Sequence, residues 1–364
     1  MNNLYNSIYK GKTVLVTGHT GFKGSWLCLW LSEMGANVIG YSLEAATHPN
    51  HVSLLEFNMI SIIGNIKDLN HLNKTIQEYK PDIVFHLAAQ ALVRYSYEHP
   101  IETYETNVLG TLKVFEACRK NGVKAIVNIT SDKAYENKEQ TVGYKENDPM
   151  GGYDPYSSSK GCAELLTSSY RNSYFNITAY KKSHHTLLAS CRAGNVVGGG
   201  DWAEDRLISD IMISVSKNKK VLIRSPYSTR PWQHVLEPLS GYLHIGQKLL
   251  QEKSQYAQAW NFGPLDKDSI SVKEVVEIVQ KYWDEIHYEI EKTSTVLHEA
   301  KILKLDCTKA YKELGWENVW NSNTTFEKTV HWYKEFYKKN TITSKNNLLE
   351  YIVDAKNKGL VWAS

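Results

Sequence analysis

Short runs of β-branched residues alternate with longer stretches of helical spacing in the first half of the chain. The runs that predict strands are Lys12–Thr17, Asn37–Tyr41, Ser61–Ile63, Asp82–His86, Ala125–Ile129 and Thr186–Arg192. The stretches that predict helices are Gly24–Gly35, Asp68–Tyr79, Ile101–Asn121 and Tyr156–Tyr174. Because each helical crossover carries the chain back to the same edge, this alternation predicts an α/β fold around a parallel sheet.

The pattern changes after about Gly194. A loop at Gly198-Gly199-Gly200 is followed by shorter, less regular elements. Three helices are then expected at Val272–Trp283, Thr325–Lys338 and Asn346–Lys358. We predict that residues 1–194 form a doubly wound domain and that residues 195–364 form predominantly a smaller, mixed α/β cap. Since no Pro/Ser-rich or charged spacer separates the halves, some cap segments are expected to return to the first domain.

Composition narrows the class of protein. The hydrophobic fraction of 42% and the charged fraction of 22% are typical of a soluble globular chain. The net charge of +3 and the scattered lysines give no reason to expect nucleic acid as a partner. No apolar run suggests a signal peptide or a membrane span. The five cysteines include no C-x-x-C pair, so we expect no disulfide framework, no metal site and a cytoplasmic protein.

A glycine-spaced turn follows the first predicted strand. Gly18, Gly21 and Gly24 form a G-x-x-G-x-x-G pattern that opens a helix, as in Rossmann dinucleotide-binding domains. The helix N-terminus offers free N–H groups to a pyrophosphate. The second strand ends at Tyr41-Ser42-Leu43, with neither an acidic residue for a ribose 2′-hydroxyl nor an arginine for a 2′-phosphate, and Glu44 lies past that position. We favour NAD over NADP.

Two segments carry candidate chemistry. Tyr156 and Lys160 form a Y-x-x-x-K pattern at helical spacing, so both side chains lie on one helix face. A lysine beside a tyrosine is expected to lower the tyrosine's pKa and make it a usable base. Upstream, the strand 125–129 leads into Thr130 and Ser131, and ligands in such folds gather at the carboxyl ends of strands.

These motifs together resemble the extended short-chain dehydrogenase/reductases that act on nucleotide sugars. Four strings are similar to those of the CDP-glucose 4,6-dehydratases, and the resemblance covers nearly the whole chain. They are Thr17–Trp26, Ser131-Asp132-Lys133, Arg192–Asn195 continuing to Trp202, and Arg230–His234. The Asp-Lys pair is the most specific, because related dTDP-glucose dehydratases have Asp-Glu there. Asn65 departs from the aspartate that the family often has near the adenine.

The resemblance implies a mechanism. Tyr156 takes the proton of the sugar 4-hydroxyl while C4 is oxidised, Ser131 hydrogen-bonds the same oxygen, and Lys160 holds Tyr156 and the nicotinamide ribose. Lys133 then removes the C5 proton and Asp132 protonates the leaving 6-hydroxyl. Hydride return to C6 regenerates NAD. For Asp132 and Lys133 the plainer interpretation is a surface ion pair in a loop.

The remaining site residues are also expected from the resemblance and from arginine's affinity for phosphates. The expected cofactor-binding residues are Gly18, Thr20, Gly21, Phe22, Gly24, Asn65, Ile66, Leu87, Ala88, Ala89, Asn107, Tyr156 and Lys160. The expected substrate-binding residues are Gln90, Asn195, Arg206 and Arg230. Trp202, Trp232 and Trp260 are candidates to stack on a base, although a buried tryptophan more often simply packs.

Alternatives remain open at this point. One is a 4-epimerase or a dehydratase of another nucleotide. Epimerases share Tyr156 and Lys160 but need no acid–base pair for water loss, which argues against that class. Another is a non-catalytic NAD-binding scaffold, which would more often lack the tyrosine or the lysine. With CDP-glucose as substrate, the resemblance implies sugar synthesis for a surface polysaccharide such as O-antigen. It also implies a homodimer or homotetramer through the helices Ile101–Asn121 and Tyr156–Tyr174.

Overall fold

The fold is built on one parallel sheet of seven strands. The computed structural model describes residues 1, 3–223, 225–264, 269–291 and 302–364. The strand order is β11-β6-β5-β4-β1-β2-β3, and all six neighbouring pairs are parallel. The strands are β1 (Thr13–Thr17), β2 (Asn37–Ser42), β3 (Ile60–Ile63), β4 (Ile83–His86), β5 (Ala125–Ile129), β6 (Leu187–Ala193) and β11 (Ala259–Phe262). The predicted α/β class with a Rossmann-type sheet is confirmed.

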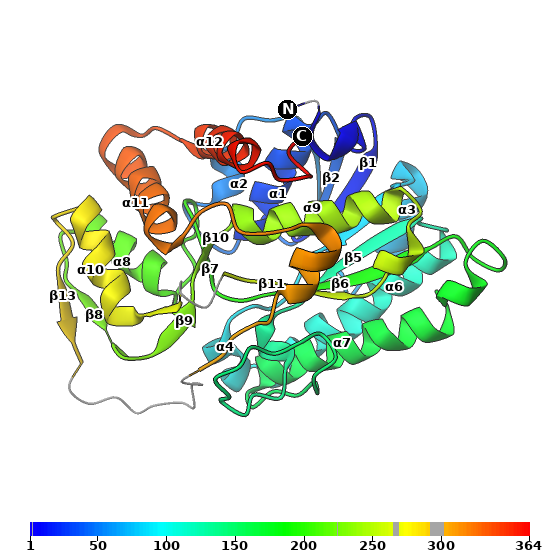
Figure 1. Ribbon diagram of the computed structural model, residues 1–364, viewed down its shortest axis with the longest axis horizontal. Helices are drawn as coiled ribbons and strands as arrows, with labels where there is room; N and C mark the ends of the chain where they lie inside the picture. The colour runs from blue at the N-terminus through cyan, green and yellow to red at the C-terminus, as the bar shows by residue number, and fades with distance from the viewer. Residues whose placement is uncertain (2, 224, 265–268, 292–301) are drawn as a thin grey trace.

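Helices cover both faces of the sheet, as Figure 1 shows. On one face lie α1 (Phe22–Glu33), α9 (Leu236–Leu250) and α12 (Ser344–Asn357), which share a core with β1, β4, β5 and β6. On the other lie α3 (Leu69–Tyr79), α6 (Thr111–Lys120) and α7 (Pro155–Ser173). Residues 24–31 of α1 are all buried, because this helix is apolar on every side. The segments α9, β11 and α12 follow residue 195 in the chain yet pack into the sheet domain.

A second core belongs to the cap. Its helices are α8 (Leu207–Ser216), α10 (Val272–Tyr282) and α11 (Ser322–Lys339), with β8 (Val221–Ile223) and β13 (Tyr288–Ile290) beside them. Short pairs join β7 (Val196–Val197) to β10 (Gln233–His234), and β9 (Thr229–Pro231) to β12 (Ser269–Ser271). The remaining α-helices are α2 (His51–Leu54), α4 (Val93–Glu98) and α5 (Pro100–Tyr104).

The predicted helix Ile101–Asn121 is not one continuous α-helix. It consists of α5, a π-helical segment (Glu105–Gly110) and α6. A π-turn inserts an extra residue per turn and often marks a functional site. In the described part of the chain, no helix combines the length and apolar character needed to cross a bilayer. Within the same residues no group of three or more metal-ligating side chains occurs, and all five cysteines are free thiols.

Candidate active site

A cavity of about 1190 Å³ lies at the carboxyl ends of the strands, between the sheet and the cap. Its wall contains every predicted site residue except Asn107, all of them among the described residues. These are Gly18, Thr20, Gly21, Phe22, Gly24, Asn65, Ile66, Leu87, Ala88, Ala89, Gln90, Ser131, Asp132, Lys133, Tyr156, Lys160, Asn195, Arg206 and Arg230. The volume exceeds that of a single drug-sized ligand, so the cavity has room for two extended ligands.

The glycine turn brings β1, β4 and the start of α1 together. Gly18 has a φ of +78°, and a Cβ there would lie 2.8 Å from the backbone nitrogen of Ala88. At Gly24 a Cβ would lie 2.1 Å from the carbonyl oxygen of Gly18. Gly21 is the N-cap of α1, and no side chain caps the helix. The N–H groups of the first turn therefore stay available to an anion in the cavity.

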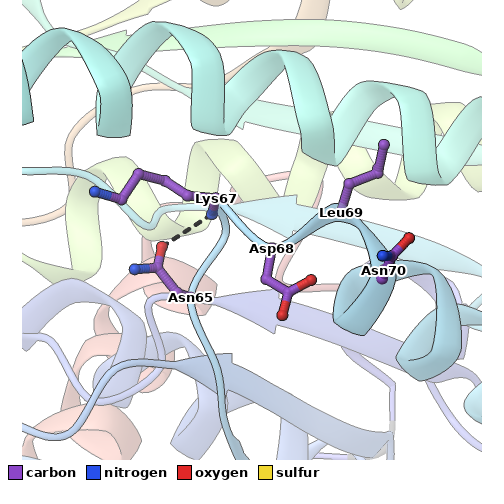
Figure 2. Close-up of a pocket in the computed structure, with 5 residues that line it drawn as sticks. All are labelled: Asn65, Lys67, Asp68, Leu69 and Asn70. Atoms are coloured by element: carbon purple, nitrogen blue, oxygen red, sulfur yellow. Dashed lines mark hydrogen bonds between the residues drawn. The ribbon is translucent and has the colours of Figure 1, made fainter.

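Hydroxyl groups occupy the end of β2, where many dinucleotide-binding folds have a carboxylate. The Oγ1 atom of Thr20 lies 2.9 Å from the Oγ atom of Ser42 and donates to the Leu43 carbonyl at 3.0 Å. Farther along the wall, the Asn65 side-chain oxygen accepts a hydrogen bond of 2.9 Å from the Lys67 backbone (Figure 2). A shallow pocket next to Asn65 continues over Asp68, Leu69 and Asn70. The amide of Asn65 is thus held in one orientation at this end.

Ser131, Asp132 and Lys133 follow directly after β5. Ser131 caps a single 3₁₀ turn (Asp132–Ala134): its Oγ atom accepts from the Lys133 backbone at 3.2 Å and donates to the Asp132 carboxylate at 3.0 Å. Asp132 is only 3% exposed. Burial raises the pKa of this carboxyl, against the opposing effects of Lys133, of hydrogen bonds and of Lys23. Asp132 is therefore not a surface ion-pair partner, and its environment favours the protonated acid.

The N-terminus of α7 presents Tyr156 and Lys160. Asp154 caps the helix by accepting from the Ser157 backbone at 2.9 Å, and Pro155 occupies the first turn. Burial lowers the pKa of Lys160 to about 8, while Glu164 acts in the opposite direction. Both catalytic candidates are buried in the cavity wall.

The expectation that the pKa of Tyr156 is lowered is wrong for the chain as described. Burial raises that pKa to about 12, because the charged phenolate is poorly solvated. The hydrogen bond with Ser131 and the charge of Arg206 act in the expected direction but are outweighed. Deprotonation of Tyr156 consequently depends on further positive charge in the cavity.

Asn107 lies beneath the cavity rather than in its wall. It belongs to the π-helical segment, and its side-chain oxygen accepts from the Gln90 backbone at 2.8 Å. Its amide nitrogen donates to the Gln90 carbonyl at 2.9 Å and to the Ser159 hydroxyl at 2.8 Å. These bonds tie the loop after β4 to α7, and the contact of Asn107 with a cofactor stays a prediction.

The predicted substrate residues differ in how they are held. Arg206 donates to the Asp201 carboxylate at 2.6 Å, and Asp201 is fixed in turn by the Tyr333 hydroxyl, which bonds with its backbone. Arg230 lies on β9 and is 8% exposed. The side-chain amide of Gln90 is engaged by Leu92 and Thr103, so this residue shapes the loop as well as lining the cavity.

Of the three tryptophans that were candidates to stack on a base, two line the cavity and one lies in the core. Trp260 is fully buried and stacks on Tyr256, outside the cavity wall. Trp202 and Trp232 line the cavity but are 5% and 6% exposed, and both pack edge-on against cap aromatics. The plain packing interpretation therefore fits Trp260.

Sequence reasoning missed Lys23. This residue stands in the first turn of α1 and lines the cavity. Burial lowers its pKa to about 8; Arg206 and Lys160 act in the same sense and Asp132 opposes them. Lys23 thus adds a further cation to a cavity wall that already contains Lys133, Lys160, Arg206 and Arg230. The available signal was its position between Gly21 and Gly24, because a first-turn side chain of this helix points back toward the glycine turn and the cavity.

Comparisons with known proteins agree with this geometry. Residues 15–331 match the family described as GDP-mannose 4,6 dehydratase. A CDP-glucose 4,6-dehydratase from Salmonella typhimurium is 52% identical over 351 residues, covering 95% of this chain and 98% of that protein. A UDP-glucose 4-epimerase from Halalkalibacterium halodurans is 27% identical, covering 88% and 96%.

Solved structures show the same fold. The dTDP-glucose 4,6-dehydratase from Bacillus anthracis in complex with NAD has a TM-score of 0.72 at 22% identity, covering 90% of this chain and 98% of that one. The UDP-glucose 4-epimerase from Brucella ovis in complex with NAD has a TM-score of 0.75 at 21% identity, covering 89% and 98%.

Proposed function

The chain belongs to the GDP-mannose 4,6 dehydratase family, and we propose that it is a CDP-glucose 4,6-dehydratase, a lyase that uses NAD. The observation that carries the proposal is its similarity, over nearly its whole length, to a CDP-glucose 4,6-dehydratase. The cavity supports it independently, because a buried acid and a lysine lie next to the serine, tyrosine and lysine needed for oxidation.

The cavity wall fits a dinucleotide. Only a residue without Cβ can stand at Gly18, where the backbones of the turn and of Ala88 approach closely. The uncapped first turn of α1 is available for the pyrophosphate, and the hydroxyls of Thr20 and Ser42 lie where the adenine ribose is expected. When bound, NAD supplies the hydride acceptor for C4 and the donor for C6, and its positive ring favours the phenolate of Tyr156.

In the oxidation half of the reaction, the phenolic oxygen of Tyr156 accepts the proton of the sugar 4-hydroxyl. Ser131 donates a hydrogen bond to the sugar 4-oxygen while that oxygen becomes a carbonyl. The charge of Lys160 favours the phenolate over the phenol. The raised pKa of Tyr156 makes this help necessary, since burial alone keeps the phenol protonated.

In the dehydration half, Lys133 removes the C5 proton, which the new C4 ketone has made acidic. Asp132 gives its proton to the 6-hydroxyl, which leaves as water while the C5–C6 double bond forms. The raised pKa of Asp132 supports this role, because a general acid must hold its proton until it is needed. A 4-epimerase, the main alternative, has no use for such a pair.

We also propose a homodimer that pairs through α5, α6 and α7, with a tetramer as the alternative. Ile101, Leu109 and Leu165 are 76%, 49% and 60% exposed on these helices and the π-segment between them, an apolar surface that a second copy would cover. The free thiols fit a reducing compartment, so we place the enzyme in the cytoplasm.

Cofactor stoichiometry tests the proposed class of reaction. Because each turnover returns the hydride to the sugar, CDP-glucose should be consumed completely with only catalytic amounts of added NAD. The absorbance of reduced nicotinamide should show no net rise while the substrate is converted. Accumulation of reduced cofactor in step with substrate would instead identify a simple dehydrogenase.

A further inference from the structure

A buried ion pair joins α7 to β6 below the cavity. The guanidinium of Arg192 donates to the Glu164 carboxylate at 2.8 Å, and the two side chains are 4% and 1% exposed. Thr130 donates to the other carboxylate oxygen at 2.5 Å, and Ser190 donates to the oxygen that binds Arg192 at 2.9 Å. Burial alone would raise the pKa of Glu164, but Arg192, the hydrogen bond from Thr130 and the charge of Arg171 outweigh it and lower the pKa to about 2. Glu164 is therefore a fixed negative charge.

Glu164 and the residues that bind it lie close in the chain to predicted site residues on α7, at the end of β5 and after β6. Glu164 stands one helical turn after Lys160 and two turns after Tyr156, on the same face of α7. Thr130 directly precedes Ser131 at the end of β5. Arg192 lies on β6, three residues before Asn195. Arg192 also donates to the Tyr135 hydroxyl at 2.6 Å, just beyond the Asp132–Ala134 turn. The network fixes α7 against both strand ends.

Lys160 needs a counter-charge because its surroundings are otherwise unfavourable to an ammonium. Lys23 faces it from α1 and Arg206 contributes a further cation to the same cavity wall. His86 on β4 stays neutral, since burial and Lys160 together lower its pKa to about 3. Burial raises the pKa of Asp132, which weakens that carboxyl as a counter-charge, and burial also keeps the phenol of Tyr156 neutral. Glu164 is the carboxylate that opposes the effect of burial on Lys160.

We propose that Glu164, locked in place by Arg192, is a positioning residue of the active site that keeps Lys160 charged. The ion pair then does more than hold the fold together, because the charge of Lys160 supports both Tyr156 and the cofactor. The inference rests on the proposed function only for the part that Lys160 plays in turnover. The effect of Glu164 on NAD binding, through the charge of Lys160, does not depend on which sugar nucleotide the enzyme converts.

The test replaces the pair by two neutral amides, Glu164→Gln with Arg192→Gln. The double variant is preferred because Glu164→Gln alone leaves a buried guanidinium without its partner, which endangers folding. At roughly 6 Å in a medium of intermediate dielectric, loss of the Glu164 charge alone corresponds to about one to two pH units, and loss of the opposite Arg192 charge offsets part of this, which leaves a net downward shift of about one unit or less. The alkaline limb of kcat/KM against pH should therefore move down by about that amount. The pH at which NAD affinity falls, followed by isothermal titration calorimetry, should move with it.

Ser190→Ala is the matched control, since it removes one hydrogen bond to Glu164 but keeps the charge. It should lower the melting temperature without moving either pH midpoint. If the double variant melts cooperatively and loses activity and NAD affinity by a constant factor at every pH, the pair is only structural and the inference is wrong. If the parent chain fails to convert CDP-glucose, the proposed function fails, while the calorimetric midpoints still decide the role of Glu164.

Discussion

Replacing Tyr156 with phenylalanine should lower the rate of product formation by ~10²–10⁴-fold, the range expected for loss of a general base. The change removes one oxygen atom from a side chain buried in the cavity wall. The backbone of Tyr156 bonds with the Ser96 hydroxyl and the helix N-cap is Asp154, so neither anchor of α7 is lost. Nucleotide binding and thermal stability should accordingly stay close to those of the parent chain.

Tyr174→Phe provides the control for this variant. Tyr174 ends the same helix, is 48% exposed, and keeps its contact with the Arg119 guanidinium when the hydroxyl is removed. Steady-state rates with CDP-glucose and melting curves of both variants make the comparison. A Tyr156→Phe variant as active as Tyr174→Phe would show that the base for the 4-hydroxyl is another group.

Replacing Lys133 with methionine should separate oxidation from dehydration. The residues assigned to the first half of the reaction, Ser131, Tyr156 and Lys160, are unchanged, so C4 should still be oxidised. Without the amine that removes the C5 proton, loss of water should slow by ~10²–10⁴-fold. Rapid quenching and mass analysis should find a keto sugar nucleotide that retains its 6-hydroxyl, up to one equivalent per active site. Exchange of the C5 proton with deuterated solvent should be lost as well.

Lys138→Met serves as the matched control, because Lys138 is an exposed lysine in the following loop and pairs across the surface with Glu136. It should behave like the parent chain. Product formed by Lys133→Met at the parent rate would mean that Lys133 is not the C5 base. The role of Asp132 as the paired acid would then need revision too.

The sheet domain could be predicted from the sequence where its elements are periodic and follow one another in the chain. The strand β11 and the helix α9 could not be predicted from the sequence. β11 is four residues long, Ala259–Phe262, and its parallel partner β6 lies more than 60 residues earlier in the chain, so no local pattern indicates their pairing. α9 contains Pro238, Gly241 and Gly246 and is buried on nearly every side, so it lacks the polar face that makes a helix recognisable.

The candidate site was predictable to the extent that its residues stand in local motifs. Lys23, Glu164 and Arg192 belong to the segments that carry these motifs, but the sequence does not distinguish them from ordinary polar residues of a helix or strand. Glu164 and Arg192 become buried only when α7 and β6 pack together, and Lys23 joins the cavity wall only when α1 packs against the sheet. The pKa of Tyr156 was misjudged for the same reason, because spacing along a helix reveals the neighbouring lysine but not the loss of solvent.

Loss of water from CDP-glucose is the reaction that we expect this chain to catalyse. The most direct measurement incubates the purified protein with CDP-glucose, dTDP-glucose and GDP-sugars in parallel, with catalytic NAD, and follows the products by mass spectrometry. We expect CDP-glucose to be converted fastest, into a product that is lighter by one water and carries a 4-keto group. A product of unchanged mass would identify an epimerase, and faster loss of water from another nucleotide sugar would contradict the assignment of the substrate.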